Sequence, residues 1–343
     1  MHFATSQYPD SMLGIVCATS TLICMSFIPK SNRGRPMYDH VTVASPATIA
    51  NFGPGFDAFG LCLDSPRDTI SIHRLSSSRR EIHTVGKHKL PTNPERNTAS
   101  YAAIRLAEMC GCEEVGFKMT VKKGMKPGSG IGSSAASSAG GALAMATMLG
   151  LKSREMVLEA AAMGEELVAG SRHFDNVSAA IYGGFTIVSD LSKRTILQIR
   201  PPAFQIVVAV PSITVNTKRA REILPKKVDI GDAVRNVGWA TGMLHAMMKR
   251  NARLIGQYLD DRLAVPYRKK LIPGYEEVRI RAIDAGAYGV SIGGSGPAVF
   301  AITQGNAVRI RKAMVSAFSE VAGLRSESFI TVPGTGAIVL SAR

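Results

Sequence analysis

The chain has 343 residues, of which 45% are hydrophobic and 20% charged, a composition typical of a globular protein with one or two domains. Its formal net charge of +15 favours an anionic partner, such as a phosphorylated metabolite or a nucleotide. The basic residues form no long block, so we expect no nucleic-acid partner, and the five cysteines lack metal-ligand spacing and predict reduced thiols.

The N-terminal segment differs from the rest of the chain. Residues 11–28 are uncharged and apolar, and the run is long enough to be considered as a membrane span. The basic residues at positions 30–35 follow the run, which argues against a signal peptide and would fit an anchor. We favour two other interpretations of residues 1–37: a disordered extension, or a translation start that lies at Met37. No membrane association is expected.

From Tyr38 onward, hydrophobic periodicity predicts an α+β protein with alternating strands and helices. The Pro201-Pro202 pair indicates a boundary between an N-terminal domain (38–200) and a C-terminal domain (201–343). Asn97 and Ser153 are the expected helix caps, and central glycines are expected to interrupt the helical segment 232–259. The predicted strands are 68–75, 117–123, 204–211, the two halves of 288–303, SFITVP and GAIVL, and the predicted helices are 97–110, 153–170, 232–259 and 307–322.

The stretch PGSGIGSSAASSAGGALAMATMLG, Pro127 to Gly150, places a glycine-rich loop directly before an alanine-rich helix. Glycines allow close approach of the backbone to a ligand, and a helix N-terminus offers free N–H groups, so the pattern predicts an anion site suited to phosphate. Ser133 and Ser134 add hydroxyls that can reach a phosphate or Mg²⁺. The loop is neither a Walker A motif nor a dinucleotide-binding motif. The simpler alternative is a glycine turn before a closely packed helix.

Three segments resemble motifs of the GHMP kinases in the same order. PGSGIGSSAAS is similar to the phosphate-binding motif, SPATIANFGPGFDAFGLCLD (45–64) to the N-terminal motif, and GGSGPAVFAI (293–302) to the C-terminal glycine motif. The resemblance implies the two-lobe GHMP kinase fold, in which the N-terminal lobe is like domain 2 of ribosomal protein S5, the C-terminal lobe is ferredoxin-like, and the active site lies between them. It implies ATP binding by Pro127, Gly128, Ser129, Gly130, Ile131, Gly132, Ser133, Ser134 and Ala135.

Four stretches narrow the resemblance: ANFGPGFDAFGLCL (50–63), GSRHFDNVSAAIYGG (170–184), NTKRAREILP (216–225) and PYRKKLIPGYEEV (266–278). They are similar to segments of the homoserine kinases of this superfamily. The resemblance implies ATP-dependent phosphorylation of the L-homoserine hydroxyl, in threonine biosynthesis and in the cytoplasm. It implies a Mg²⁺ site made by Ser134 and Glu165, with Glu166 as the alternative acid. It implies that the substrate-binding residues are Asn51, Asp57, His173, Asp175, Thr217, Arg221 and Arg268.

The chemistry of these residues suits a zwitterionic alcohol. Asp57 or Asp175 is apt for the substrate ammonium, and Arg221 and Arg268 for its carboxylate. Thr217 can orient the hydroxyl. The catalytic candidates are Asn51, Thr217 and His173, and the identity of any general base is left open. Taken alone, each of these residues also has a simpler structural interpretation, such as a solvated arginine or a turn aspartate.

Two alternative functions remain. One is a sister kinase such as an archaeal-type shikimate kinase or a mevalonate-pathway kinase, against which the segments HFDN and TKRAREILP argue. The other is a non-catalytic, basic nucleic-acid-binding protein. The resemblance also implies a homodimer, and it places the adenine near the loop before the NPERNTAS helix and the strand at 117–123.

Overall fold

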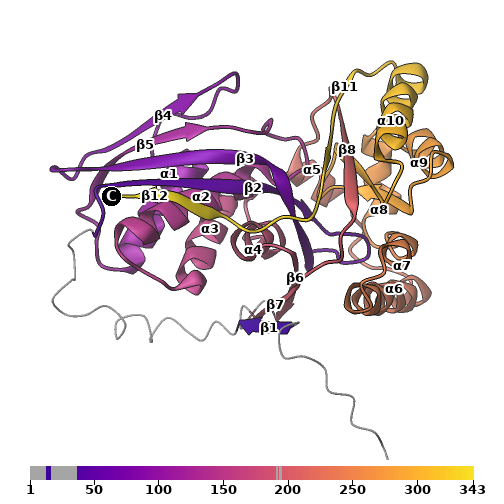
Figure 1. Ribbon diagram of the computed structural model, residues 1–343, viewed down its shortest axis with the longest axis horizontal. Helices are drawn as coiled ribbons and strands as arrows, with labels where there is room; N and C mark the ends of the chain where they lie inside the picture. Colours follow the sequence, from indigo (N-terminus) through magenta and orange to yellow (C-terminus); the bar gives the residue numbers. More distant parts are fainter. Residues whose placement is uncertain (1–12, 17–36, 191, 193–194) are drawn as a thin grey trace, which may run out of the picture.

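The computed structural model describes residues 13–16, 37–190, 192 and 195–343 (Figure 1). The predicted extension 1–37 therefore lies mostly outside the described residues. Leu13–Val16 forms β1, which pairs antiparallel with β7 (Thr195–Ile199). In the described ranges, no helix is both long and apolar enough to span a membrane.

The first lobe is a sheet covered on one face by helices (Figure 1). In the described part of the chain the sheet has eight strands in the order β1-β7-β6-β3-β2-β12, and β5 pairs with both β3 and β4. Its remaining strands are β2 (His40–Ala50), β3 (Phe59–Leu75), β4 (Arg80–Val85), β5 (Gly116–Lys122), β6 (Phe185–Asp190) and β12 (Ile338–Ala342). The helices are α1 (Thr98–Met109), α2 (Ser133–Met148), α3 (Arg154–Ala169) and α4 (Phe174–Tyr182).

The second lobe is built on a four-stranded antiparallel sheet in the order β11-β8-β10-β9. Helices α9 and α10 cover one face, while α6, α7 and the first lobe cover the other. The strands are β8 (Gln205–Pro211), β9 (Gly289–Ile292), β10 (Val299–Thr303) and β11 (Ser326–Thr331). The helices are α5 (Thr217–Glu222), α6 (Ile230–Met248), α7 (Ala252–Gln257), α8 (Val265–Arg268), the 3₁₀ turn η3 (Lys269–Leu271), α9 (Tyr275–Asp284) and α10 (Ala307–Ala322).

The continuous apolar run of β8 follows from burial on both faces of the second sheet. Val208 faces the core shared with the first lobe, whereas Val207 packs against α9 and α10. Phe300 of β10 stacks on Phe52 from the loop after β2, with ring centroids 5.3 Å apart. Each such fully buried phenylalanine contributes roughly 1.5–3 kcal/mol, so this aromatic contact holds the two lobes together behind the cleft.

The local predictions are confirmed in most elements. Asn97 and Ser153 accept hydrogen bonds from the first turns of α1 and α3, as N-caps do. The predicted interruption of the helical segment 232–259 by its glycines is wrong. Helix α6 runs through Gly242, whose missing side chain makes room for the ring of Tyr258, and the break comes at Arg250, where φ is +53°.

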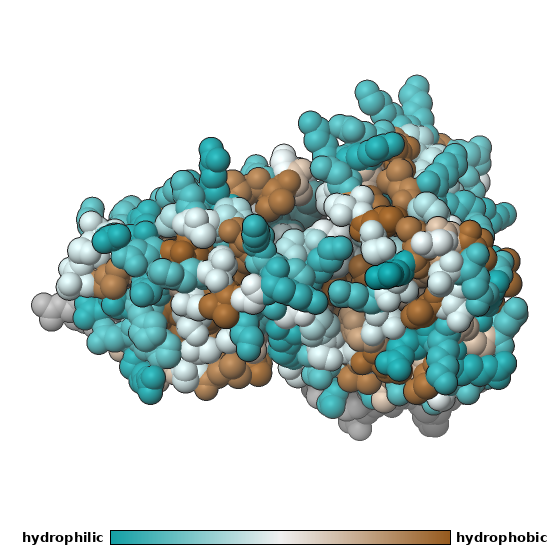
Figure 2. All heavy atoms as spheres, turned by 90° about the horizontal axis from the view of Figure 1, so that it is seen from above, coloured by the Kyte–Doolittle hydropathy of each residue, from teal (hydrophilic) through white to brown (hydrophobic). Residues whose placement is uncertain are grey.

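The α+β class with two lobes is confirmed. The boundary near residue 200 stays a prediction. One element beyond it, the last strand of the chain, belongs to the sheet of the first lobe. Strand β12 returns to the first sheet, where it pairs antiparallel with β2. The edge of β2 would otherwise offer unpaired backbone groups, so the C-terminal strand completes the sheet of the first lobe. Seen from above, hydrophilic residues cover much of the visible surface, and hydrophobic residues lie among them in small groups (Figure 2).

Candidate active site

A cavity of about 420 Å³ lies where the glycine loop, α1, α3, α4, α5 and α8 converge. It brings together most of the residues predicted from the sequence. Three of the predicted ATP-binding residues do not line it, because Ser129, Ile131 and Ala135 are buried behind the loop. The predicted residues that line the cavity are Asn51, Asp57, Pro127, Gly128, Gly130, Gly132, Ser133, Ser134, Glu165, His173, Asp175, Thr217, Arg221 and Arg268.

The glycine loop has a backbone that other residues adopt only at a cost. Gly128, Gly130 and Gly132 have φ of +70°, +81° and +66°. A Cβ on Gly130 would lie 2.7 Å from the backbone of Gly296, and a Cβ on Gly132 would lie 1.9 Å from Thr48 Oγ1. The loop therefore packs directly against the second glycine turn, and the C-terminal motif supports the phosphate motif from behind.

Helix α2 begins at this loop without a side-chain cap. Gly132 is its N-cap and provides no side-chain hydrogen bond to the first turn. The free N–H groups and the positive end of the helix dipole therefore remain available at the cavity, beside Ser133 and Ser134. This arrangement is chemically suited to a phosphate-like anion.

A buried carboxylate stands opposite this helix start. Ser134 Oγ donates a hydrogen bond to Glu165 Oε2 at 3.0 Å, and Oε1 has no partner among the residues that the structure describes. Burial raises the pKa of Glu165 to about 7. An underbonded buried carboxylate beside a hydroxyl supplies the hard oxygen ligands that Mg²⁺ prefers, so this pair fits the metal. Glu166, the alternative, faces away and pairs with Arg172.

Lys123 supports the loop and was missed by the sequence analysis. It forms a buried ion pair with Asp68 and donates to the carbonyl of Ser133 at 2.7 Å and to Ser137 Oγ at 3.0 Å. Burial lowers its pKa. These bonds fix the first turn of α2 and leave a cation at the cavity wall. The sequence offered no signal, since a lysine after a strand is ordinarily solvated.

The opposite end of the cavity is built on strained backbone. Asn51 and Asp57 have φ of +61° and +56°, which is uncommon outside glycine. The N–H of Asp57 donates to Asn51 Oδ1 at 2.9 Å, and Asn51 Nδ2 donates to the carbonyl of Gly294 at 3.2 Å. Asn51 thus joins the N-terminal motif to the C-terminal glycine turn and holds Asp57 at the cavity. Such strain is typical of functional sites.

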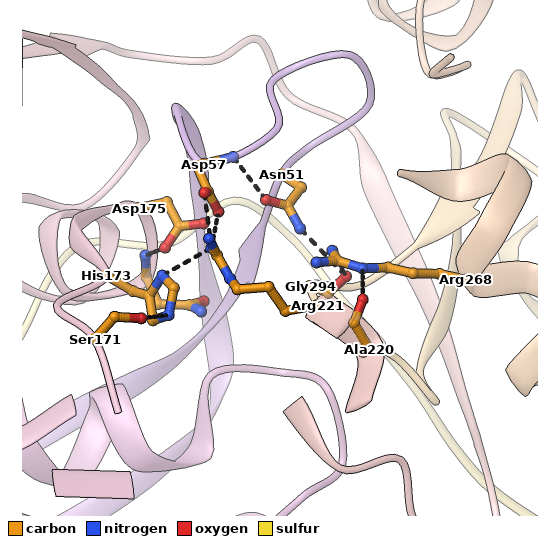
Figure 3. A network of polar contacts seen from close by, with 10 residues as sticks. Asn51, Asp57, Ser171, His173, Asp175, Ala220, Arg221, Arg268 and Gly294 are labelled. Carbon is orange, nitrogen blue, oxygen red and sulfur yellow. Dashed lines mark hydrogen bonds and ion pairs between the residues drawn. The ribbon is translucent and has the colours of Figure 1, made fainter. Parts of the chain in front are cut away.

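Arg221 is the centre of the polar network in Figure 3. Its Nη2 donates to both carboxylate oxygens of Asp57, at 2.8 and 2.7 Å, and lies 3.4 Å from His173 Nδ1. His173 Nε2 lies 3.0 Å from Ser171 Oγ. Burial and the charge of Arg221 lower the pKa of His173, so the imidazole is neutral near pH 7.

Arg268 and Asp175 complete this end of the cavity. Arg268 is buried, and it donates to the carbonyls of Ala220 and Gly294 at 3.2 and 2.9 Å. Burial and the neighbouring charge of Asp57 raise the pKa of Asp175 to about 7. This end of the cavity therefore holds two guanidinium groups and two carboxyl groups.

A buried asparagine joins the loop before Asp57 to the loop before the helix that carries Arg268. Asn236 of α6 donates to the carbonyl of Pro54 at 2.8 Å and accepts from the N–H of Arg262 at 3.1 Å. Pro54 precedes Asp57, and Arg262 precedes the helix that carries Arg268. A single buried side chain thus restrains both loops, which the sequence analysis did not anticipate.

The third part of the cavity is distant from these charges. It is lined by the loop before α1, which is one of the two segments predicted for the adenine, and by the last turn of α3, which was not; the other predicted segment, the strand at 117–123, contributes only Lys123 to the cavity, and the adenine position stays a prediction. The residues that line this part are Lys89, Leu90, Pro91, Arg96, Asn97, Thr98, Leu167, Val168 and Ala169.

The fold and the glycine-rich cleft define a small-molecule kinase of the GHMP class. The family models described as GHMP kinases N terminal domain and GHMP kinases C terminal match residues 97–184 and 243–320. The homoserine kinase of Thermococcus gammatolerans is 46% identical over 85% of this chain and 97% of its own length, and that of Pyrococcus furiosus is 45% identical over 86% and 98%. This chain belongs to the homoserine kinase family of the GHMP kinases.

Solved structures agree with this assignment. The homoserine kinase from Cytophaga hutchinsonii has a TM-score of 0.81 and 35% identity, covering 89% of this chain and 98% of that one. The L. major mevalonate kinase has a TM-score of 0.69 over 88% and 99%, and its 15% identity supports the fold alone. The predicted resemblance and the predicted two-lobe architecture are confirmed.

Proposed function

We propose that this chain transfers the terminal phosphate of ATP to the hydroxyl of L-homoserine, which forms O-phospho-L-homoserine in threonine biosynthesis. The observation that carries the proposal is the pairing, in one cavity, of an anion-binding helix start with a pocket that holds both carboxyl and guanidinium groups. A zwitterionic acceptor needs both charges, whereas an uncharged sugar needs neither. The curated relatives that are similar over most of the chain carry the same activity in their name.

In this proposal L-homoserine binds by its two charged ends in the acceptor pocket, which is the end of the cavity that holds Asp57, Asp175, Arg221 and Arg268. Asp57 or Asp175 receives the ammonium, and Arg221 and Arg268 receive the carboxylate. Asp57 and Arg221 pair with each other in this structure, so the substrate must take the place of that contact. The pair is partly exposed and its strength is screened by solvent, which makes the exchange feasible.

The nucleotide occupies the other two parts of the cavity in this proposal. The ATP phosphates lie against the start of α2 and near Lys123, and the adenine lies between the loop before α1 and the end of α3. Ser134 and Glu165 would hold Mg²⁺, whose charge neutralises the phosphates when it is bound.

Positioning and charge neutralisation dominate phosphoryl transfer, so a strong base is not required. Both ring nitrogens of His173 already face polar partners, namely Arg221 and Ser171. We therefore assign His173 to orienting Arg221 rather than to removing the hydroxyl proton. Asn51 and Thr217 would position the acceptor, since Thr217 Oγ1 lies at the glycine turn, 3.5 Å from Ser295 Oγ.

We also propose that the enzyme acts in the cytoplasm as a homodimer. No nucleic-acid partner is proposed, because most of the residues predicted from the motifs line the cavity and have a role there without one.

The test is ADP release with ATP, Mg²⁺ and a panel of acceptors: L-homoserine, shikimate, mevalonate, galactose and no acceptor. We expect turnover with L-homoserine alone. Turnover with another alcohol would overturn the proposed substrate while leaving the kinase class intact. No turnover with any acceptor, from a folded sample that binds ATP, would favour a non-catalytic function.

A further inference from the structure

Phe56 lies against both arginines of the acceptor pocket, and the proposed reaction gives it no role. It belongs to the loop between β2 and β3, directly before Asp57. The guanidinium carbon of Arg268 lies 5.3 Å from the centroid of the Phe56 ring, and that of Arg221 lies 5.7 Å from the same centroid. Both distances are typical of a cation over an aromatic face. Phe56 does not line the cavity, so any effect on a substrate acts through other side chains.

The two arginines come from separate segments of the second lobe. Arg221 belongs to α5, and Arg268 is the last residue of α8. Both guanidinium groups reach into the polar network of Figure 3. Phe56 comes from the first lobe, so one ring contacts cations on two independent helices across the cleft. It can therefore set the spacing between the two groups as well as the position of each.

Arg268 is a buried cation that needs such support. The residue is 5% exposed, and its hydrogen-bond acceptors among the described residues are two backbone carbonyls. Burial lowers the pKa of Arg268, the charge of Asp57 opposes this shift, and the charge of Arg221 adds to it. A buried charge that has no carboxylate bonded to it is costly, as is its repulsion by a second cation. The negative face of the Phe56 ring offsets part of both costs.

An aromatic ring stabilises a guanidinium without occupying its donors. A guanidinium over a ring can meet it with its flat face, which leaves the N–H groups along its edge free. A carboxylate in place of the ring would also neutralise the arginines, but it would take the donors that a substrate carboxylate needs. The ring also restricts two long side chains before binding, so less conformational freedom is lost when the substrate arrives.

The backbone that carries Phe56 is held in place on both sides. The buried side chain of Asn236 donates to the carbonyl of Pro54 at 2.8 Å. The N–H group of Phe59 donates to the carbonyl of Gly55 at 2.8 Å, which closes a turn around Phe56. The ring is therefore mounted on a restrained loop, as a platform for other side chains requires.

We propose that Phe56 is a positioning residue that holds Arg221 and Arg268 together as one fork for the carboxylate of the acceptor. This inference rests on the proposed reaction and deepens it, because it identifies what selects an alcohol that also carries a carboxylate. The carboxylate does not take part in phosphoryl transfer. Its binding is therefore the same in the ground state and the transition state, and loss of the ring should change KM rather than kcat.

The first experiment is steady-state kinetics of the full chain with L-homoserine and ATP. Phe56→Leu should raise the KM for L-homoserine roughly tenfold and leave kcat and the KM for ATP within about twofold. Phe56→Tyr keeps the ring and should retain a KM near that of the unmodified chain. Tyr288→Leu is the matched control, since the Tyr288 ring centroid lies 5.0 Å from the guanidinium carbon of Arg253, away from the cavity. Its KM for L-homoserine should not change.

The second experiment asks whether Phe56 acts through the arginines. The value of kcat/KM for L-homoserine is measured for Phe56→Leu, for Arg221→Leu and for both changes together, and the cycle is repeated with Arg268→Leu. Residues that act through one another give losses that do not add, so Phe56→Leu should cost only about threefold in either arginine variant. Arg221 is partly exposed, so its cycle can be read whether or not the buried Arg268→Leu variant folds.

The outcomes separate this inference from the proposed reaction. An unchanged KM for L-homoserine in Phe56→Leu overturns the positioning role and keeps the reaction. A loss that persists in full in the arginine variants also overturns the role, since the ring would then act through the shape of its loop. A comparable rise in the KM for ATP overturns it as well, because the damage would extend to the whole cleft. No turnover of L-homoserine by the unmodified chain overturns the reaction itself, and the role with it.

Discussion

The guanidinium of Arg221 donates to both carboxylate oxygens of Asp57, at 2.8 and 2.7 Å, although the two residues come from different lobes. These are the side chains assigned to opposite ends of the proposed substrate. In the absence of that substrate they neutralise each other, so neither charge is left unpaired in the cleft. An amino acid that binds here supplies both missing partners at once, which favours a zwitterion over an alcohol with a single charge.

Asp57→Asn should raise the KM for L-homoserine about tenfold to hundredfold, because a hydrogen bond to a charged group is worth roughly 1.5–3 kcal/mol. The amide keeps the shape of the side chain and the backbone bond to Asn51. Steady-state kinetics with L-homoserine and with 4-hydroxybutanoate, which lacks the amino group, measure the effect. The same loss for both acceptors would remove Asp57 from the ammonium site.

Ser134→Ala should lower kcat about tenfold or more and shift the Mg²⁺ requirement to higher concentration, because it removes one proposed oxygen ligand. The measurement is the initial rate over a Mg²⁺ titration at saturating ATP. Thr147→Ala at the far end of α2 is the control, since its hydroxyl only bonds within the helix. An unchanged Mg²⁺ dependence in Ser134→Ala would argue against the metal assignment.

Asp175 should make the ligand-free enzyme less stable as the pH rises. Its pKa is raised from 3.8 to about 7, so between these values the folded state holds a proton that the unfolded state has released. Its contribution is therefore full below about pH 4 and is lost as the pH approaches 7, a change of roughly 4 kcal/mol. Urea denaturation between pH 4.5 and 8 measures this slope.

Asp175→Asn should reduce that slope by about half, since the amide does not titrate while Glu165, whose pKa is also raised to about 7, still does. Asp284→Asn, a change at an exposed aspartate of α9, should leave it in place. If Asp175→Asn keeps the full slope, another buried group is responsible for the pH dependence.

Asn236→Ala should raise the KM for L-homoserine by about tenfold and leave the KM for ATP nearly unchanged. The side chain restrains the loops before Asp57 and Arg268, and losing two buried hydrogen bonds costs roughly 1–3 kcal/mol. Asn251→Ala is matched to it, because it removes the cap of α7 and also costs stability. Equal KM values in the two variants would reduce Asn236 to a structural role.

Local features of this protein could be predicted from the sequence because neighbouring residues decide them. Asn97 and Ser153 cap their helices through bonds to N–H groups two and three residues ahead. The backbone of the phosphate loop could be predicted for the same reason, since its left-handed conformation depends on glycines that have no side chain. The three motifs in order then predicted the cleft between the lobes.

Contacts between segments that are far apart in the sequence could not be predicted, because only the folded chain brings these segments together. The ion pair of Lys123 with Asp68 and the two bonds of Asn236 join residues far apart in sequence, and a lone lysine or asparagine carries no mark of its future neighbour. Gly242 was expected to break α6 because glycine weakens an isolated helix, yet here its missing side chain admits Tyr258. Only packing in three dimensions decides whether such a glycine ends a helix or lets it continue.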